Sequence, residues 1–585
     1  MALTVLENTG PGAPAAAPAG RGRRRHGVEW PTVAVVAAVV AVLALLVLYP
    51  LARVLVAAFG PSGKAVLTDI VSSSVDRGIV VNTLVLGVVV GLAGTILGFL
   101  MAFVQVRVAF RGKRIVHLLC LLPVVSPPFA VATAIITLLG RRGVITHGLF
   151  GLNTNIYGLP GLSLVLALSF FPVAYMNFLG MLKALDPVLD EASANLGATG
   201  WQTFRKVTLP MLAPGFAASF LLLFVEAIAD LANPLVIGGD YTVLASRAFI
   251  AITGEYDVGA GAAFSLVLLL PAILVFLVQR YWVSRKSVVS VTGKPAGSPR
   301  LITSAAGRIP LVGFAVLVGL VVTTIYATVI LGGLVKILGI DNRFTLDNYR
   351  YVLSGIGNEA IKDTTILALI ATPIAGLMGM LVAWLVVRKL RPWAASALDF
   401  LGMLGLAVPG TVLGIGYAVA FNTPLIVGNR MFLPALGGGA AMFGGALALV
   451  MVYVIRSMPS GQRSGIAALQ QIDPSIDEAA ASLGASSTTV FRTVTLPLIR
   501  PALLSGLIYA FARSMTTLSP IIFITTPQTQ IMTKQILSEV DAGRFGNAFA
   551  FCTLLLVIVL AVMGLLTLLV HHEGRPARQT GGGAR

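Results

Sequence analysis

The sequence predicts an all-α, polytopic membrane protein with about twelve transmembrane helices in two homologous six-helix halves. Two observations lead to this fold class. Hydrophobic residues make up 57% of the 585-residue chain and charged residues only 11%, whereas about a quarter of the residues in a soluble protein are charged. A polar motif also occurs twice, around Glu191 and again 287 residues later around Glu478. A repeat at so long an offset indicates a duplicated unit.

Twelve stretches are long and apolar enough to cross a membrane, since a span needs about 20 mostly apolar residues. We expect six in the first half, near residues 32–58, 80–106, 115–139, 160–182, 211–237 and 261–283. Six more follow in the second half, near 309–337, 361–387, 396–421, 440–458, 499–525 and 547–570. The repeated motif falls between the fourth and fifth spans of each half, which supports the division.

Composition sets the expected boundaries of five segments. Residues 1–27 are rich in Ala, Pro, Gly and Arg and predict a disordered basic tail. The first half covers 28–286, and a linker rich in Gly, Pro, Ser and basic residues covers 287–308. The second half covers 309–572, and a short tail closes the chain at 573–585.

The formal net charge of +18 fits a membrane surface better than nucleic acid. The basic clusters alternate with less basic segments in step with the predicted spans, and the positive-inside rule assigns all of them to the cytoplasmic side. Both termini and both motifs are then cytoplasmic. Arg141 and Arg142 depart from this pattern, in a loop predicted to lie outside. We therefore expect a multi-pass protein of the cell membrane, with the lipid bilayer as a partner and no nucleic acid.

No cofactor or metal site is predicted. The chain has two cysteines, Cys120 and Cys552, both inside predicted spans and without CxxC spacing. Asp240, Glu255 and Asp257 form an acidic group in a predicted outer loop. Ferric ions favour oxygen ligands of this kind, but a solvated loop has the same composition, and we prefer that interpretation.

Each copy of the motif predicts a short helix followed by the start of the next span. An Asp-Pro pair, Asp186-Pro187 or Asp473-Pro474, is a helix-start signal, and a glycine eleven residues after the aspartate ends the helix. The predicted loops cover 186–210 and 473–497. Their candidate functional residues are Glu191, Ala192, Gly197, Leu209 and Pro210 in the first copy and Glu478, Ala479, Gly484, Leu496 and Pro497 in the second.

At these residues the chain resembles the permease subunits of ATP-binding-cassette (ABC) importers. Their signature is Glu-Ala-Ala, three residues, Gly, nine residues and Ile-x-Leu-Pro; here Ser193 replaces one Ala, and Val207 and Val494 replace the Ile. The resemblance implies the type I ABC importer permease fold, with this loop as a coupling helix that fits a groove on the ATPase. It also implies two copies of a cytoplasmic ATPase subunit and an extracytoplasmic substrate-binding protein as partners.

The chain looks like two such permeases fused into one. The segments 230–239, 291–294 and 465–474 are similar to those of ferric-iron importer permeases, which implies a translocation pathway for ferric iron or a ferric complex. Related permeases import 2-aminoethylphosphonate or sugar phosphates, and that alternative stays open. An ion-driven secondary transporter can also have twelve spans, but it ranks lower because it needs no ATPase-docking loop.

The chain is expected to be no enzyme and to lack its own ATPase site. A phosphate-binding loop requires GxxxxGK followed by Ser or Thr. The nearest approaches, Gly63-Lys64-Ala65 and Gly293-Lys294-Pro295, do not complete it.

Polar residues inside predicted spans are candidates for the pathway or its gate, because an ionisable group in hydrocarbon is costly. Glu226, Asp230 and Asn233 are spaced i, i+4, i+7 and are predicted to share one face of the fifth span. The 287-residue offset pairs Glu226 with Arg513 and Asp230 with Thr517, and Thr516 adjoins them. We expect Glu226 and Arg513 to approach across a pseudo-twofold axis, either as a structural ion pair or as part of the pathway lining.

Two further pairs of equivalent positions occur. Asn82 and Asp363, each followed by threonine, are expected to cap helices at the outer ends of their spans. Pro127-Pro128 and Pro409-Gly410 interrupt the third span of each half, and broken helices commonly border transport cavities.

Overall fold

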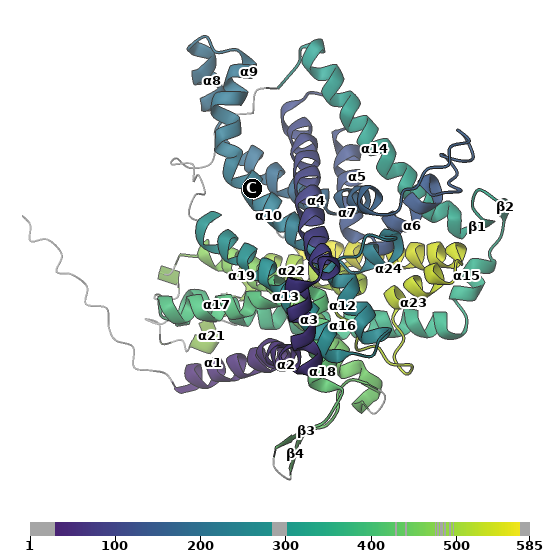
Figure 1. The fold of residues 1–585 in the computed structure, drawn as a ribbon. Coiled ribbons are helices and arrows are strands. Elements are labelled where there is room, and N and C mark those ends of the chain that lie inside the picture. Colours follow the sequence, from purple (N-terminus) through teal and green to yellow (C-terminus); the bar gives the residue numbers. More distant parts are fainter. Residues whose placement is uncertain are drawn as a thin grey trace, which may run out of the picture.

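The computed structural model describes residues 30–283, 301–427, 430–438 and 441–573, the last without 474, 477, 478, 480–483, 485, 486, 491, 492 and 495. The predicted tail 1–27, most of the predicted linker and Glu478 lie outside the described residues. Figure 1 shows a helical molecule in which two short hairpins are the only strands drawn in the described part.

The first half begins with α1 (Trp30–Leu43), η1 (Ala44–Leu48), α2 (Tyr49–Ala58), α3 (Pro61–Ser72), α4 (Ser74–Arg107), α5 (Lys113–Val125), α6 (Pro128–Leu139) and α7 (Leu159–Ala184). It continues with α8 (Val188–Asn195), α9 (Gly200–Thr203), η2 (Phe204–Thr208), α10 (Leu209–Ala229), α11 (Ala232–Ile237), α12 (Leu244–Thr253), α13 (Val258–Val278) and η3 (Gln279–Val283).

The second half begins with α14 (Ala305–Gly333), β1 (Val335–Ile337), β2 (Asp341–Phe344), α15 (Asp347–Val352), α16 (Gly355–Trp384), η5 (Leu385–Lys389), α17 (Pro392–Ala407) and α18 (Gly410–Phe421). It continues with β3 (Leu425–Val427), β4 (Arg430–Leu433), η6 (Met442–Gly445), α19 (Ala446–Gln470), α21 (Ser487–Val490), α22 (Leu496–Thr516), α23 (Met532–Asp541) and α24 (Phe545–Glu573). Strands β1 and β2 form one antiparallel hairpin, and β3 and β4 form the other.

In the described part, nine helices are long and apolar enough to cross a membrane, or eleven if two bent pairs each count as one span. The bent pairs are α5 with α6, at 107°, and α17 with α18, at 97°. Pro127 and Pro409 stand at the two breaks, as the residues just before α6 and α18. Proline cannot donate a backbone hydrogen bond and disfavours a helical residue before it. The predicted interruption of both third spans is confirmed.

The fifth and eleventh predicted spans are shorter than expected. Helix α10 ends at Ala229, Asp230 is extended, and α11 begins a new helix. Pro234 supplies the reason, because in an unbroken helix its ring would clash with the carbonyl of Asp230 four residues earlier. The equivalent helix α22 ends at Thr516, not near residue 525. It is 21 residues long and contains Arg500 and Arg513, and it is not among the nine apolar helices counted in the described part.

The two halves repeat one packing arrangement. Helix α4 packs on α7 and α10, and α16 packs on α19 and α22. Gly98 and Gly379 stand at equivalent points of these contacts: a Cβ on Gly98 would lie 2.7 Å from the backbone nitrogen of Tyr175, and one on Gly379 2.6 Å from the carbonyl oxygen of Met458. Small residues allow membrane helices to approach this closely.

The first span of each half packs against the broken third span of the other half. Helix α2 contacts α18, and α14 contacts α5 and α6. A hydrogen bond of 2.8 Å from Tyr417 Oη of α18 to the carbonyl of Leu46 in η1 also joins the first span to α18. The buried apolar residues follow this exchange, because each of the two large core clusters draws side chains from both halves.

Candidate functional site

The first copy of the motif forms the short helix that the sequence predicts. The Asp186 carboxylate accepts a hydrogen bond of 3.0 Å from the Val188 amide at the start of α8. Gly197 follows the helix with φ of +77°, a conformation that suits glycine because a Cβ would be strained there. Leu209 and Pro210 begin α10, with the proline in the first turn. Figure 1 shows α8 and α9 projecting together from one end of the molecule.

Two neighbouring carboxylates of α8 have opposite environments. Asp190 is buried and forms an ion pair with Arg107 at the end of α4. Glu191 is exposed, and its carboxylate has no hydrogen bond or ion pair to any described residue. The ion pair fastens α8 to a membrane helix, whereas Glu191 is available to another protein. Sequence reasoning gave no indication of this pair.

Apolar side chains surround Glu191 on the projecting end. Leu196 is 88% exposed, Trp201 67% and Val188 54%. Exposed apolar groups beside a charge are typical of surfaces that bind another protein. Ala192, also exposed, belongs to the same surface, which we call the coupling surface: Val188, Glu191, Ala192, Leu196 and Trp201.

The described residues of the second copy repeat this geometry. Asp473 accepts a hydrogen bond of 2.9 Å from the Ser475 amide, and this bond holds the pKa of the Asp473 carboxyl below its usual range. Gly484 has φ of +80°, and Leu496 and Pro497 begin α22. Ala479 is exposed. Glu478 lies outside the described residues, so its expected position remains a prediction.

All six residues predicted for the pathway line one cavity of about 550 Å³ between the halves: Glu226, Asp230, Asn233, Arg513, Thr516 and Thr517. Both helix breaks border the same cavity, through Pro127 and Gly410. The structure therefore brings together residues that lie almost 300 positions apart in the sequence.

Glu226 and Arg513 approach each other as the offset predicts. Arg513 Nη2 lies 3.8 Å from Glu226 Oε1, and the two side chains are 20% and 27% exposed. The separation is longer than a hydrogen bond. Each charge nevertheless offsets the cost of keeping the other inside the membrane region.

Asp230 does not share a helix face with Glu226, and that prediction is wrong because α10 ends before it. Its carboxylate instead accepts hydrogen bonds of 2.9 Å from both the backbone and the side-chain amide of Asn233. These bonds cap α11, whose first amide groups have no partner within the helix.

Asn82 and Asp363 also differ from the expectation, since both lie within helices and not at their ends. Asn82 donates to the carbonyl of Thr242, and Asp363 accepts from the amide of Gln530. The threonines that follow them, Thr83 and Thr364, accept from the first amide groups of α12 and α23 at 2.8 Å each. The two pairs hold equivalent short helices against α4 and α16.

Two of the three carboxylates in the acidic loop, those of Glu255 and Asp257, have structural contacts. Glu255 forms an ion pair of 2.9 Å with Arg247. Asp257 accepts hydrogen bonds of 2.9 Å from the Ala260 amide and from Ser62 Oγ. Within the described ranges, no group of three or more metal-ligating side chains is arranged to hold an ion.

Sequence reasoning missed two arginines of α19 that line the cavity, Arg456 and Arg463. Arg456 donates to the carbonyls of Gly405 and Val408, at 3.3 and 3.1 Å, where α17 ends and the chain bends. It lies inside a predicted span, so the rule that selected Glu226 would also have selected it. Arg463 follows that span and gave no such signal.

The two-fold repeat, the two copies of the motif and the shared cavity define a permease subunit that contains both halves of a transport pathway. Residues 94–288 and 375–572 both match the family described as binding-protein-dependent transport system inner membrane component, and the chain belongs to this family.

Two relatives resemble the chain over most of its length. It is 33% identical to the ferric transport system permease protein FbpB of Actinobacillus pleuropneumoniae, over 91% of this chain and 77% of the relative. It is also 33% identical to the putative ferric transport system permease protein FbpB 1 of Haemophilus influenzae, over 83% and 76%. A crystal structure of a bacterial ABC transporter for alginate import has 15% identity and a TM-score of 0.36, covering 46% of this chain and 99% of that chain.

Proposed function

We propose that the chain forms the translocation pathway of an ATP-driven importer for ferric iron or a ferric complex. One observation carries the iron assignment: two relatives with ferric transport in their names are each 33% identical to the chain over more than three quarters of its length. Import of 2-aminoethylphosphonate or a sugar phosphate by the same route is the alternative.

Two copies of a cytoplasmic ABC ATPase would bind the chain, one at each coupling helix. The exposed, unpaired Glu191 and the apolar side chains of the coupling surface support this docking. Glu191 and Glu478 would accept charge-assisted hydrogen bonds from basic residues of the ATPase. The sequence completes no phosphate-binding loop, so ATP hydrolysis belongs to these partners and not to this chain.

The coupling helices and both termini would lie on the cytoplasmic side, as the distribution of basic residues favours. The opposite end, with α12 and α23, would then receive the extracytoplasmic binding protein. The boundaries of the tails, of the linker at 287–308 and of the two halves at 28–286 and 309–572 belong to the same proposal.

ATP-driven closure of the two ATPase copies would move the coupling helices and so the spans. The buried ion pair of Arg107 with Asp190 links α8 to α4, and Gly98 allows close contact between α4 and α7. ATP-driven closure can shift the equilibrium between the inward-open and outward-open states only as far as the ATPase binds one state more favourably than the other. Glu226, Asp230, Asn233, Arg513, Thr516 and Thr517 would line the pathway or its gate.

Reconstitution tests the proposal. The chain, its ATPase and its binding protein are placed in liposomes, and uptake of radioactive ferric iron is measured with and without ATP. We expect uptake only with ATP and with all three components. Uptake at full rate by the chain alone would show that it is a channel or a secondary transporter, and uptake of a phosphonate or sugar phosphate instead of iron would select the alternative.

A further inference from the structure

The cavity walls contributed by the two halves differ in charge. Helices α7 and α19 are equivalent, since they begin 287 residues apart, at Leu159 and Ala446. The same offset places Arg456 opposite Ser169 and Arg463 opposite Met176. Ser169 and Arg456 line the same central cavity. The arginines are therefore no requirement of the shared fold, because the other half builds the same helix without them.

Arg463 lies where three cavities meet. It lines the central cavity, a smaller one of about 300 Å³ and a third of about 650 Å³ beside α17. Arg456 and Arg463 are seven residues apart and so share one face of α19. The smaller cavity contains both arginines and four hydroxyl side chains: Ser460, Ser464, Ser505 and Tyr509.

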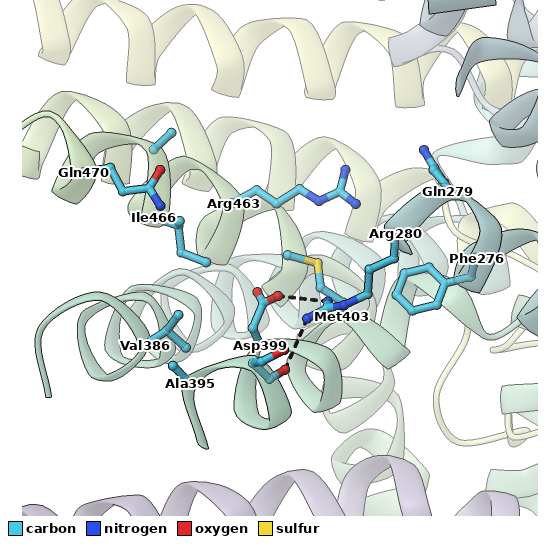
Figure 2. Close-up of a pocket in the computed structure, with 12 residues that line it drawn as sticks. Phe276, Gln279, Arg280, Val386, Ala395, Asp399, Met403, Arg463, Ile466 and Gln470 are labelled. Carbon is cyan, nitrogen blue, oxygen red and sulfur yellow. Dashed lines mark hydrogen bonds and ion pairs between the residues drawn. The ribbon is translucent and has the colours of Figure 1, made fainter. Parts of the chain in front are cut away.

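In the third cavity, the other charged side chains, Arg280 and Asp399, pair with each other and not with Arg463. Arg280 forms an ion pair of 2.8 Å with Asp399 and donates to the carbonyl of Ser396. Figure 2 shows this pair with dashed lines, while Arg463 extends from α19 on the other side of the cavity without one. In the described part of the chain, the Arg463 guanidinium has no hydrogen bond or ion pair.

The central cavity consequently has an excess of positive charge. Its ionisable side chains are Arg456, Arg463 and Arg513, which are basic, and Glu226 and Asp230, which are acidic. Arg513 faces Glu226, and Asp230 caps α11. Arg456 is held by two carbonyl oxygens, which carry no full charge. A bare ferric ion would be repelled by these arginines, whereas an oxygen-rich anion would be attracted.

We propose that the pathway binds its cargo through the oxygen atoms of an oxyanion, and that ferric iron passes only in complex with a small oxyanion, either phosphate or a carboxylate. The iron in this proposal rests on the proposed function above. Arg463 would bind the oxyanion through its planar fork of donors, which matches phosphate and carboxylate oxygens. The hydroxyl groups of the smaller cavity would supply further hydrogen bonds as the cargo moves along α19.

A double-label transport assay tests the proposal. The full complex with ATPase and binding protein is given ⁵⁵Fe³⁺ with either [³²P]phosphate or [¹⁴C]citrate, and both labels are counted inside the liposomes. We expect iron and one of the anions to enter at a constant ratio, and the two arms identify which anion it is. Entry of iron without either anion would overturn the proposal. Entry of an anion without iron would support the anionic pathway and overturn the iron assignment alone.

Substitutions of Arg463 localise the effect. Arg463→Met gives α19 the residue that α7 carries, and we expect transport to fall about tenfold, the effect of losing one charge-assisted hydrogen bond. Arg463→Lys should retain most of the rate. Arg308→Gln is the matched control, since Arg308 is exposed near the start of α14 and away from these cavities. The Arg463→Met variant should still co-purify with its ATPase. If that assembled variant transports at the normal rate, Arg463 does not bind the oxyanion.

Discussion

The two halves of the molecule are alike where helices meet and unlike where they face the cavity. Gly98 and Gly379 fill equivalent close contacts, and Thr83 and Thr364 accept equivalent hydrogen bonds. In the cavity, by contrast, Glu226 of the first half faces Arg513 of the second. The comparison teaches that helix packing was kept in both copies after duplication, while the cavity lining of each copy diverged.

The largest effect is expected where both halves must act together. Glu191→Ala combined with Glu478→Ala should abolish ATP-driven uptake, because a desolvated charge pair that loses one partner costs about 2 to 5 kcal/mol, here at two sites. Two measurements test this: the rate of ATP-driven uptake, and the amount of ATPase that co-purifies with the variant. The two single variants, compared side by side, show whether the coupling helices contribute equally. Normal uptake and assembly in the double variant would refute the docking role.

Breaking the buried pair beneath α8 should have the next largest effect. Asp190→Ala leaves Arg107 buried without its carboxylate, and such a change costs about 3 to 5 kcal/mol. The melting temperature of the purified chain should fall, and coupling of ATP hydrolysis to uptake should weaken. Replacing both residues by leucine should be less harmful than the single change. An unchanged melting temperature for Asp190→Ala would mean that this contact does not hold the coupling helix.

A charge exchange tests the unlike pair in the cavity. Either Glu226→Arg or Arg513→Glu alone places two like charges together and should lower transport several-fold, whereas the two changes combined should restore much of it. The transport rates of the original protein, the two single variants and the combined variant are compared. If the combined variant is no better than the single ones, the two side chains do not act as a pair.

The smallest effect concerns the two glycines that follow the coupling helices. Gly197→Ala and Gly484→Ala each place a Cβ on a residue with positive φ, although the space around both is open. The strain should cost about 1 kcal/mol at each site. Thermal unfolding should show the same small decrease for both variants. A large difference between them would show that the two coupling loops are less alike than the repeat indicates.

Much of the fold and of the coupling site could be predicted because the signals are local. The Asp-Pro start and the glycine end define α8 within twelve residues, and the prolines at 127 and 409 mark the helix breaks. Pro234 is also a local signal, since it ends the helix before Asp230, and the i, i+4 spacing from Glu226 therefore does not give the two residues a common helix face. The pairing of Asp190 with Arg107 joins residues 83 positions apart, and no pattern in a single sequence indicates it.

The offset between the copies was the most useful long-range signal. It predicts that Glu226 and Arg513 lie close together, because equivalent helices of a duplicated protein meet at its pseudo-twofold axis. It could not indicate Arg463, whose equivalent, Met176, is apolar. The offset identifies a pair only when both equivalent positions carry polar or charged residues, and position 176 does not.

The exchange of first spans has a consequence for assembly. Since α2 packs on α18 and α14 packs on α5 and α6, neither half can complete its own bundle during synthesis. After insertion, the packing face of the first span therefore contacts lipid until the second half has also been inserted. A gene divided within the linker at 287–308 should therefore still yield a working transporter when both fragments are produced together, and an unstable product when either is produced alone.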